Sequence, residues 1–526
     1  MGQLSSRGKR RIVKLAKGGL SVGRLGITVA PLAALVLNAS VPAIARPPIH
    51  TPASPASRLA EASPPLEFMG LGYVEPGLGV FIGDRPQASS KPSPFSPQTK
   101  SAQKVNQGEA QYFFERGLER LENGNFSGSV EDFDSTLERL KAESAATRAD
   151  GSEITYALVY YNRGNAYLQL RAVEKAQADY DRAIDLNPEF TNAYINRGVT
   201  RRALENWEGA IADYDRALEL NPYDADIYYN RGNVHRSREN WDAAIADYGQ
   251  AVKLRANHAN AYVNRAAVHH HLGNLDQALA DSNAALKIDD DLPEAFFNRG
   301  LVRFDKKDNL GAIADFTQVI RLQPQYARAY VRRGAIYHAL RDYRAARRDY
   351  NQALAIDDES AEALNLRGLL SVAQGDLNRA RLDYNLALRV DPNYASAYIN
   401  RGISYHRSGL YPKAIADYTQ AIALEPNNPS AHHLRGLSHQ AQGNQTAAVA
   451  NFNQAIALDA NFADSYVNRA IAYWSQQGQA SGEQQAQLRQ AARQDLTTAK
   501  QLYQQQGNEA GLATVARVGD RFSSQS

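Results

Sequence analysis

The 526-residue chain contains no cysteine and only two methionines. The missing cysteine excludes disulfides, thiolate metal sites, cysteine nucleophiles and a lipid anchor on an N-terminal cysteine. The chain also has little net charge, +3, and the positive sign comes from one end. Residues 1–45 carry seven basic and no acidic side chains, and the remainder holds 52 basic against 56 acidic residues, or −4. The body therefore lacks the positive charge that attracts nucleic acid.

The first 45 residues have the composition of an export signal. A basic stretch that ends at Arg24 precedes an apolar run of roughly 20 residues, nearly the length of a membrane span. The run ends at Ala43-Ile44-Ala45, whose small residues have the spacing that signal peptidase accepts. We predict a signal peptide over residues 1–45, with an uncleaved membrane anchor as the alternative. Either interpretation predicts an exported protein, in the periplasm or in the lumen of an internal membrane system.

Residues 46–110 predict a largely disordered linker. Eleven of the 21 prolines lie between residues 46 and 104, together with many serines and alanines. Such a composition buries too little apolar surface to fold alone. One segment, Leu66–Gly83, is apolar and glycine-rich. It is either a segment that docks on the body or a partner, or a plain part of the linker.

From residue 111 the sequence repeats every 34 residues. Each copy contains an arginine followed by glycine or alanine, and an eleventh copy lies upstream at Arg116, before a polar insertion of 13 residues. The spacing of small and aromatic residues predicts two helices per copy, joined by a polar turn. The other ten arginines are Arg163, Arg197, Arg231, Arg265, Arg299, Arg333, Arg367, Arg401, Arg435 and Arg469.

Glycine follows the arginine in nine copies, and Ala266 and Ala470 take its place in the other two. Glycine inside a helix costs about 1 kcal/mol relative to alanine, so its recurrence needs a packing reason. We expect the second helix to approach closely here, with its small alanine face opposite the glycine. One helix pair cannot cover its own apolar face, so the copies must stack into one continuous core.

The pattern resembles the tetratricopeptide repeat family. The resemblance covers roughly Gln111 to Tyr503, and the matching positions of one copy are Gly198, Ala210, Tyr214, Ala217 and Pro222. It implies an all-α fold, a right-handed superhelical solenoid of about eleven antiparallel helix pairs whose first helices line a concave groove. The chain departs from the family at the arginine before the glycine, where the family usually has an apolar side chain.

The C-terminal end departs from the regular repeat. We predict the repeat array over residues 111–475, and the end of the last copy, a capping helix and a short tail over residues 476–526. An insertion of about ten residues precedes Asp495, where we expect the second helix of the last copy to restart. Leu512, Val515 and Val518 then lie on one side of the capping helix, which covers the core face of the last copy.

The recurring arginine predicts a recurring partner, because a partly buried guanidinium without one is costly. An aspartate directly precedes the aromatic residue of the second helix in the first nine copies. We predict a ladder of arginine–aspartate pairs, whose role is structural. The aspartates are Asp132, Asp179, Asp213, Asp247, Asp281, Asp315, Asp349, Asp383 and Asp417.

An asparagine precedes the arginine in seven copies. The helical step of 100° places it away from the core, on the open face, and its amide can donate to and accept from a peptide backbone. The array resembles that of O-linked N-acetylglucosamine transferase, in which a similar ladder holds extended peptides. Two interpretations stand: a peptide-binding ladder, or simple inheritance through recent duplication. The residues are Asn162, Asn196, Asn230, Asn264, Asn298, Asn400 and Asn468.

Charged residues replace the ladder in one later copy. Arg328, Arg332 and His338 are predicted to share the groove face, where they can bind a carboxylate. The alternative is that Glu294 and Asp305 of the preceding copy already neutralise them.

Three adjacent histidines, His269 to His271, suggest a metal cluster. Successive helical residues point about 100° apart, however, so the three side chains cannot converge on one ion. We interpret them as incidental polar residues.

No segment supplies a nucleophile with its base, a phosphate-cradling loop or a set of metal ligands. We therefore predict a non-enzymatic interaction scaffold without cofactor, which binds a protein or peptide in the groove. The membrane is a partner only through an uncleaved N-terminus. The alternatives are a glycan-binding repeat protein, with Tyr161, Tyr229 and Phe297 stacking on sugars, or a nucleic-acid-binding one.

Overall fold

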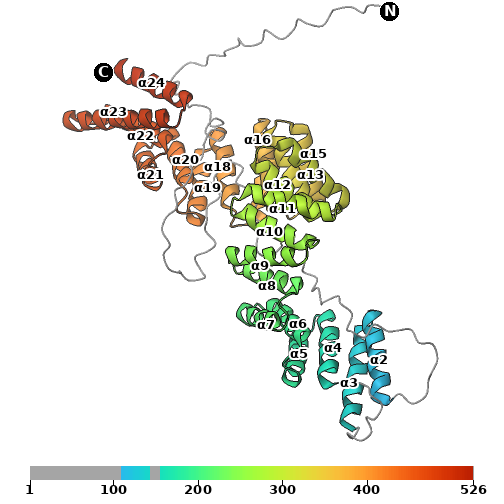
Figure 1. The fold of residues 1–526 in the computed structure, drawn as a ribbon. Helices are drawn as coiled ribbons and strands as arrows, with labels where there is room; N and C mark the ends of the chain where they lie inside the picture. Colours follow the sequence, from blue (N-terminus) through green and yellow to red (C-terminus); the bar gives the residue numbers. More distant parts are fainter. Residues whose placement is uncertain (1–107, 143–154, 525–526) are drawn as a thin grey trace, which may run out of the picture. The chain divides into compact units, whose positions relative to one another are not determined.

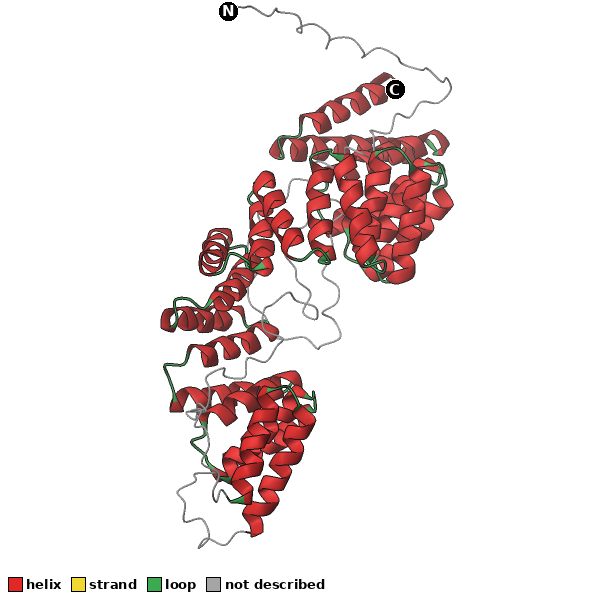
Figure 2. Cartoon of the chain, turned by 90° about the vertical axis from the view of Figure 1, so that its right-hand side faces the viewer, coloured by secondary structure: helices red, strands yellow, loops and turns green. Residues whose placement is uncertain are grey.

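The computed structural model describes residues 108–142 and 155–524. These residues form α-helices, one 3-10 turn and connecting loops, with no strand among them (Figure 2). The predicted leader, most of the linker with its segment Leu66–Gly83, and most of the insertion after the first repeat lie outside the described residues. The described chain divides into an N-terminal body that ends at Ser408 and a C-terminal body that begins at Gly409.

The N-terminal body contains eight complete helix pairs and the first helix of a ninth (Figure 1). The first helices are α2 (Glu109–Glu122), α4 (Tyr156–Gln169), α6 (Thr191–Ala203), α8 (Ala225–Ser237), α10 (Ala259–His271), α12 (Pro293–Asp305), α14 (Ala327–Ala339), α16 (Ala361–Ala373) and α18 (Ala395–Arg407). The second helices are α3 (Phe126–Ala142), α5 (Val173–Leu186), α7 (Trp207–Leu220), α9 (Trp241–Leu254), α11 (Leu275–Ile288), α13 (Asn309–Leu322), α15 (Tyr343–Ile356) and α17 (Leu377–Val390).

Local sequence fixes where the helices begin. Asn206 stands before α7 and accepts a hydrogen bond from the Gly209 backbone N–H, and Asp342 caps α15 in the same way through Ala345. Such side chains satisfy backbone donors that have no partner inside the helix. Pro293 occupies the first position of α12, where no N–H is needed. The turns between helices are thus encoded copy by copy.

The two kinds of helix occupy different sides of the stack. First helices of consecutive repeats contact each other, as α6 does with α8 and α10 with α12, whereas no two second helices make comparable contacts among the described residues. The first helices therefore line the inner side of the stack. Between the two layers lies a core of fully buried aromatic rings, among them Tyr180, Tyr214 and Tyr248. The predicted all-α fold of stacked helix pairs is confirmed.

The recurring glycine lies against an aromatic ring. A Cβ atom added to Gly198 would lie 2.8 Å from the Cε1 atom of Tyr214, and Gly232 faces Tyr248 in the same way. The prediction of close approach is correct, but the prediction that alanines stand opposite the glycine is wrong. The ring lies sixteen residues after the glycine, and it reaches further toward the first helix than the alanines beside it.

The two copies without glycine support this explanation. Sixteen residues after Ala266 stands Ser282 instead of an aromatic residue, and both are buried. In the last repeat, Ala470 shares a core cluster with Leu496, which has replaced the ring. A methyl group on the first helix thus occurs only where the second helix has a smaller side chain.

We expect Gly198→Ala to lower stability by about 1–3 kcal/mol, the usual cost of overpacking, although alanine is the better helix former by about 1 kcal/mol. Urea unfolding of the full chain measures the effect. Combining Gly198→Ala with Tyr214→Leu copies the pair in the last repeat and should cost less than the sum of the single variants. A stabilising effect of Gly198→Ala would contradict the packing explanation.

The C-terminal body contains α19 (Tyr411–Leu424), α20 (Pro429–Ala441), α21 (Gln445–Leu458), α22 (Ala463–Gln476), a 3-10 turn (Gln477–Gln479), α23 (Gly482–Gln505) and α24 (Glu509–Ser524). The prediction that the second helix restarts at Asp495 is wrong. The helix begins at Gly482 instead, because the polar insertion is rich in good helix formers and extends the helix toward its N-terminus.

The last helix, α24, packs on α22 and α23. Val515 is buried in their core, and Leu512 and Val518 pack against it. The ring of Phe522 stacks on Trp474, with 4.1 Å between the ring centres. This helix therefore occupies the position expected of a capping helix. In the described part of the chain, no helix is both long and apolar enough to cross a membrane.

Candidate functional site

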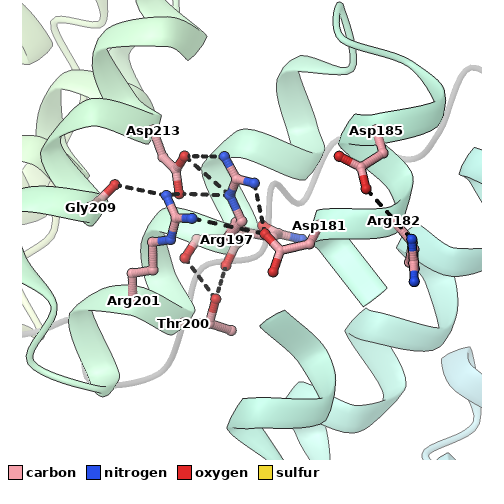
Figure 3. Close-up of polar contacts among 9 residues, drawn as sticks. Asp181, Arg182, Asp185, Arg197, Thr200, Arg201, Gly209 and Asp213 are labelled. Atoms are coloured by element: carbon pink, nitrogen blue, oxygen red, sulfur yellow. Dashed lines mark hydrogen bonds and ion pairs between the residues drawn. The ribbon is translucent and has the colours of Figure 1, made fainter. Parts of the chain in front are cut away.

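The predicted ladder of arginine–aspartate pairs is formed in all eight complete repeats of the N-terminal body. The Arg197 guanidinium donates to both carboxylate oxygens of Asp213, from Nη2 at 2.6 Å and from Nε at 3.0 Å (Figure 3). Asp213 also pairs with Arg201, one helical turn further along α6. Burial raises the pKa of Asp213, and the hydrogen bonds from Arg197 oppose this rise. The same pairing holds from Arg116–Asp132 to Arg367–Asp383. The pair Arg401–Asp417 would join the two bodies and stays a prediction.

Six of the eight ladder arginines also donate to the preceding repeat; Arg116 begins the series, and Arg265 faces Gly249, which has no side-chain acceptor. Nη1 of Arg197 donates to Asp181, on the second helix of the repeat before, at 2.8 Å (Figure 3). Arg231 makes the same bond to Asp215, and in later repeats Asn351 or Thr317 is the acceptor. The arginine therefore fastens one repeat to the next as well as one helix to its partner. Sequence reasoning missed this second acceptor, although it recurs two residues after the ladder aspartate.

The predicted asparagine ladder is mostly buried. Asn162, Asn196, Asn264, Asn298 and Asn400 are buried, whereas Asn230 and Asn468 are half-buried. The expectation that these side chains lie on an open face is wrong for the buried five, which are packed at the junctions between first helices.

Four of the five buried asparagines make hydrogen bonds between repeats. Nδ2 of Asn196 donates to Oδ1 of Asn165 in the preceding repeat at 2.8 Å. The same oxygen accepts from the hydroxyl of Tyr180, which would otherwise be a buried donor without partner. Asn264, Asn233 and Tyr248 repeat this arrangement in α8 to α10. These amides hold the junctions together.

The other ladder positions vary. Asn400 donates to Asn365 of the preceding repeat, and Asn298 to the Val263 carbonyl. Asn162 and Asn468 donate to carbonyls of their own helices. Asn230 lacks both acceptors that Asn196 has. Asn196 donates to Tyr161 and Asn165 of α4, whereas the equivalent residues of α6, in front of Asn230, are Ile195 and Val199.

Arg332 is neutralised by a neighbouring carboxylate. Its side chain is 6% exposed, and Nη1 donates to Glu362 of the following repeat at 2.8 Å. The alternative interpretation of the sequence gave this role to Glu294 and Asp305 of the preceding repeat. Asp305 instead lies 2.6 Å from Nε2 of His270, and burial raises the pKa of Glu294. The charge of Arg332 is therefore balanced, but by a different residue.

Arg328 and His338 each make contacts of their own, and the site that they would share with Arg332 stays a prediction. Burial lowers the pKa of His338 to about 4, so this histidine is neutral at pH 7. Its ring lies edge-on to Tyr343, at 5.9 Å between centres. Arg328 is half-buried, with its guanidinium carbon 5.7 Å from the centre of the Phe297 ring. The positive charge of Arg328 is therefore partly accessible to solvent.

The histidine triplet serves packing and pairing. His270 pairs with Asp305, and the ring of His271 lies 4.3 Å from that of Trp241. Among the described residues there is no group of three or more side chains that could hold a metal ion. Tyr229 and Phe297, candidates for sugar stacking, are 2% and 1% exposed and so present no free ring face.

Sequence comparison supports the repeat assignment. The family described as TPR repeat matches residues 200–237, 232–273, 368–409, 404–443 and 440–477. Three further tetratricopeptide repeat families match residues 157–190, 327–360 and 259–292. Together these segments cover half of the chain. The chain belongs to the tetratricopeptide repeat family. Membership suggests a protein–protein interaction scaffold.

Several solved tetratricopeptide repeat structures are similar to the chain. The APC/C hetero-tetramer Cut9–Hcn1 is 15% identical, with 69% of this chain and 76% of that chain covered and a TM-score of 0.42. Yeast Tom70 is 14% identical, with coverages of 79% and 96% and a TM-score of 0.39. YrrB, described as a TPR protein with an unusual peptide-binding site, is 25% identical, with coverages of 36% and 97% and a TM-score of 0.32. No curated protein matches the chain in sequence.

Proposed function

We propose that this tetratricopeptide repeat protein is a non-enzymatic scaffold that binds an extended peptide segment of a partner protein along the face lined by its first helices. The observation that carries the proposal is a row of half-buried amides on α6, α8 and α10. Asn192 and Asn260 lie one helical turn before ladder positions, and Asn230 is itself a ladder position. Nδ2 of Asn230 is a buried donor that has no hydrogen-bond partner among the described residues.

The spacing of these amides suits an extended peptide. Packed helices lie about 8–10 Å apart, and an extended chain rises about 3.3 Å per residue, so each repeat corresponds to about three residues of peptide. An asparagine amide can both donate to and accept from a peptide backbone, so it reads no particular side chain. The buried asparagines beside the row fix the junctions, which keeps the half-buried amides in register.

We also propose that the scaffold works outside the cytoplasm. The support is the basic and apolar leader of residues 1–45, which lies outside the described residues. The absence of cysteine is compatible with an oxidising compartment.

Peptide selection on the full chain tests the proposed groove. A library of random 12-residue peptides is selected against the protein, and the affinity of the selected peptides is measured by fluorescence anisotropy. The triple variant Asn192→Ala, Asn230→Ala and Asn260→Ala should weaken binding by about tenfold or more, because it removes several hydrogen bonds of about 0.5–1.5 kcal/mol each.

The matched control removes two amides from the second helices, by Gln250→Ala and Gln352→Ala, and should leave binding unchanged. Thermal melts of both variants confirm that each still folds. Failure to select any peptide, or equal binding by the triple variant and the control, would rule out the groove.

A further inference from the structure

The second helices carry a basic and apolar surface on two neighbouring repeats. On α15, Arg344 and Arg348 are exposed; on α17, so are Arg379, Leu382 and Leu386. We call these five residues the arginine–leucine patch. Arg348 and Leu382 hold the same register position in adjacent repeats, so the basic and apolar parts lie at matching positions of consecutive second helices. The patch belongs to the second helices and is therefore separate from the inner side.

The arginines of the patch are not paired with any carboxylate in the described part of the chain. No carboxylate of the described residues lies within 4.0 Å of Arg344, Arg348 or Arg379, whereas every ladder arginine of the eight complete repeats is paired. The local aspartates are engaged elsewhere. Asp342 and Asp376 cap α15 and α17, and Asp349 and Asp383 are held by the ladder arginines of their own repeats.

The pKa of a neighbouring arginine, Arg347, is affected by the positive charges around the patch. Arg347, between the two patch arginines of α15, is half-buried and donates to Gln374. Burial lowers its pKa and the charge of Arg379 lowers it further; Arg367 adds to this effect, whereas Asp383 and Asp376 oppose it. Most other shifted arginines of the fold have raised pKa values because carboxylates face them, as at Arg231. Positive charge therefore exceeds negative charge around Arg347, although Asp383 and Asp376 offset part of it.

The leucines of the patch form an apolar stripe in water. Leu382 is 64% exposed and Leu386 is 36% exposed, and Val390, one turn further, is 41% exposed. The spacing of four residues places all three on one side of α17. In other repeats the residues equivalent to Leu382 and Leu386 are different. They are Ala246 and Gln250 in α9, and Ala314 and Gln318 in α13. Exposed leucine pairs here are therefore not a feature of the repeat itself.

We propose that the arginine–leucine patch binds an acidic amphipathic helix of a partner protein. A stripe with a spacing of four residues matches the apolar side of a second helix, and the flanking guanidinium groups match carboxylates along its edges. Arginine forks bind carboxylates through two parallel hydrogen bonds, a geometry that lysine lacks. A nucleic-acid backbone would satisfy the arginines but would leave the leucines in water.

A designed peptide tests the proposal directly. The probe is an 18-residue helical peptide with leucines every three to four residues on one side and glutamates beside them, labelled for fluorescence anisotropy. The full chain should bind it with an affinity that falls steeply between 50 and 500 mM salt. Arg344→Glu with Arg348→Glu should weaken binding at least tenfold, and Leu382→Ser with Leu386→Ser should weaken it at every salt concentration.

The control reverses the same amount of charge on other second helices, through Arg182→Glu with Arg216→Glu, and should keep full affinity. A peptide with lysines in place of the glutamates should not bind. Vesicles that contain anionic phosphatidylglycerol form the second arm. Vesicle binding that is lost in the patch variants, without binding of the acidic peptide, would overturn the proposal in favour of a membrane surface. Binding of neither probe, or equal loss in the control, would also overturn it.

Discussion

Asp247→Ala is expected to lower the free energy of unfolding by about 3 kcal/mol, because it leaves a half-buried guanidinium without its main partner. The Asp247 carboxylate accepts from Nη2 of Arg231 at 2.6 Å and from Nε at 2.9 Å. Asp215 of the preceding repeat stays bonded to Nη1, so the loss is smaller than for a fully isolated charge. Urea unfolding of the full chain, followed by circular dichroism, measures the change.

Two further variants separate the charge from the hydrogen bonds. The repeat that contains Arg435 already has an asparagine, Asn451, in place of the ladder aspartate. Nε of Arg435 donates to Oδ1 of Asn451 at 2.7 Å. Asp247→Asn should therefore cost clearly less than Asp247→Ala. The double variant Arg231→Leu with Asp247→Ala should recover much of the loss, because an apolar pair of similar volume needs no charge balance. Equal stability of Asp247→Ala and the wild type would remove the ladder as a stabilising element.

The ladder shows what a repeated sequence can predict. An arginine and an aspartate that recur together at fixed spacing in successive copies must meet, since each copy adopts the same fold. The link from Arg197 to Asp181 follows the same rule, but it joins different copies, and only the stacking of repeats brings these two residues together. Periodicity therefore predicts contacts within a repeat better than contacts between repeats.

The exposure and the partners of side chains on the inner side were predicted less well, for a related reason. A helical wheel placed Asn196 and Asn264 on an open face, because it considers one helix alone. In the stack the preceding first helix covers that face and supplies the acceptors Asn165 and Asn233. Arg332 is likewise neutralised from the following repeat, by Glu362, rather than from the preceding one. The partners of a side chain at a junction depend on the distance and rotation between repeats, which no single copy encodes.

Acidification is expected to destabilise the C-terminal body through His433. This side chain is fully buried between the rings of Phe452 and Phe462, and its Nδ1 lies 2.8 Å from the Ser465 hydroxyl. Burial lowers the pKa of His433 to about 3. No described residue partners its Nε2, so a proton there would be buried without an acceptor.

The sign follows from proton binding in the two states. Below about pH 6.5 the unfolded chain protonates this histidine while the folded chain does not, so stability falls as the pH drops from about 6.5 to about 3. The full loss from this one residue is roughly 5 kcal/mol, and none of it is expected above pH 7.5.

His433→Phe removes the titrating group and keeps a ring, as Phe297 does at the equivalent position of an earlier repeat. The difference in unfolding free energy between wild type and variant should therefore change by about 3 kcal/mol between pH 7 and pH 4, in favour of the variant. Other buried histidines, such as His338 with its pKa of about 4, cancel in this difference because both proteins contain them. A difference that does not vary with pH would show that the folded protein accommodates the charged ring, and the packing around His433 would then have to be looser than the ring contacts indicate.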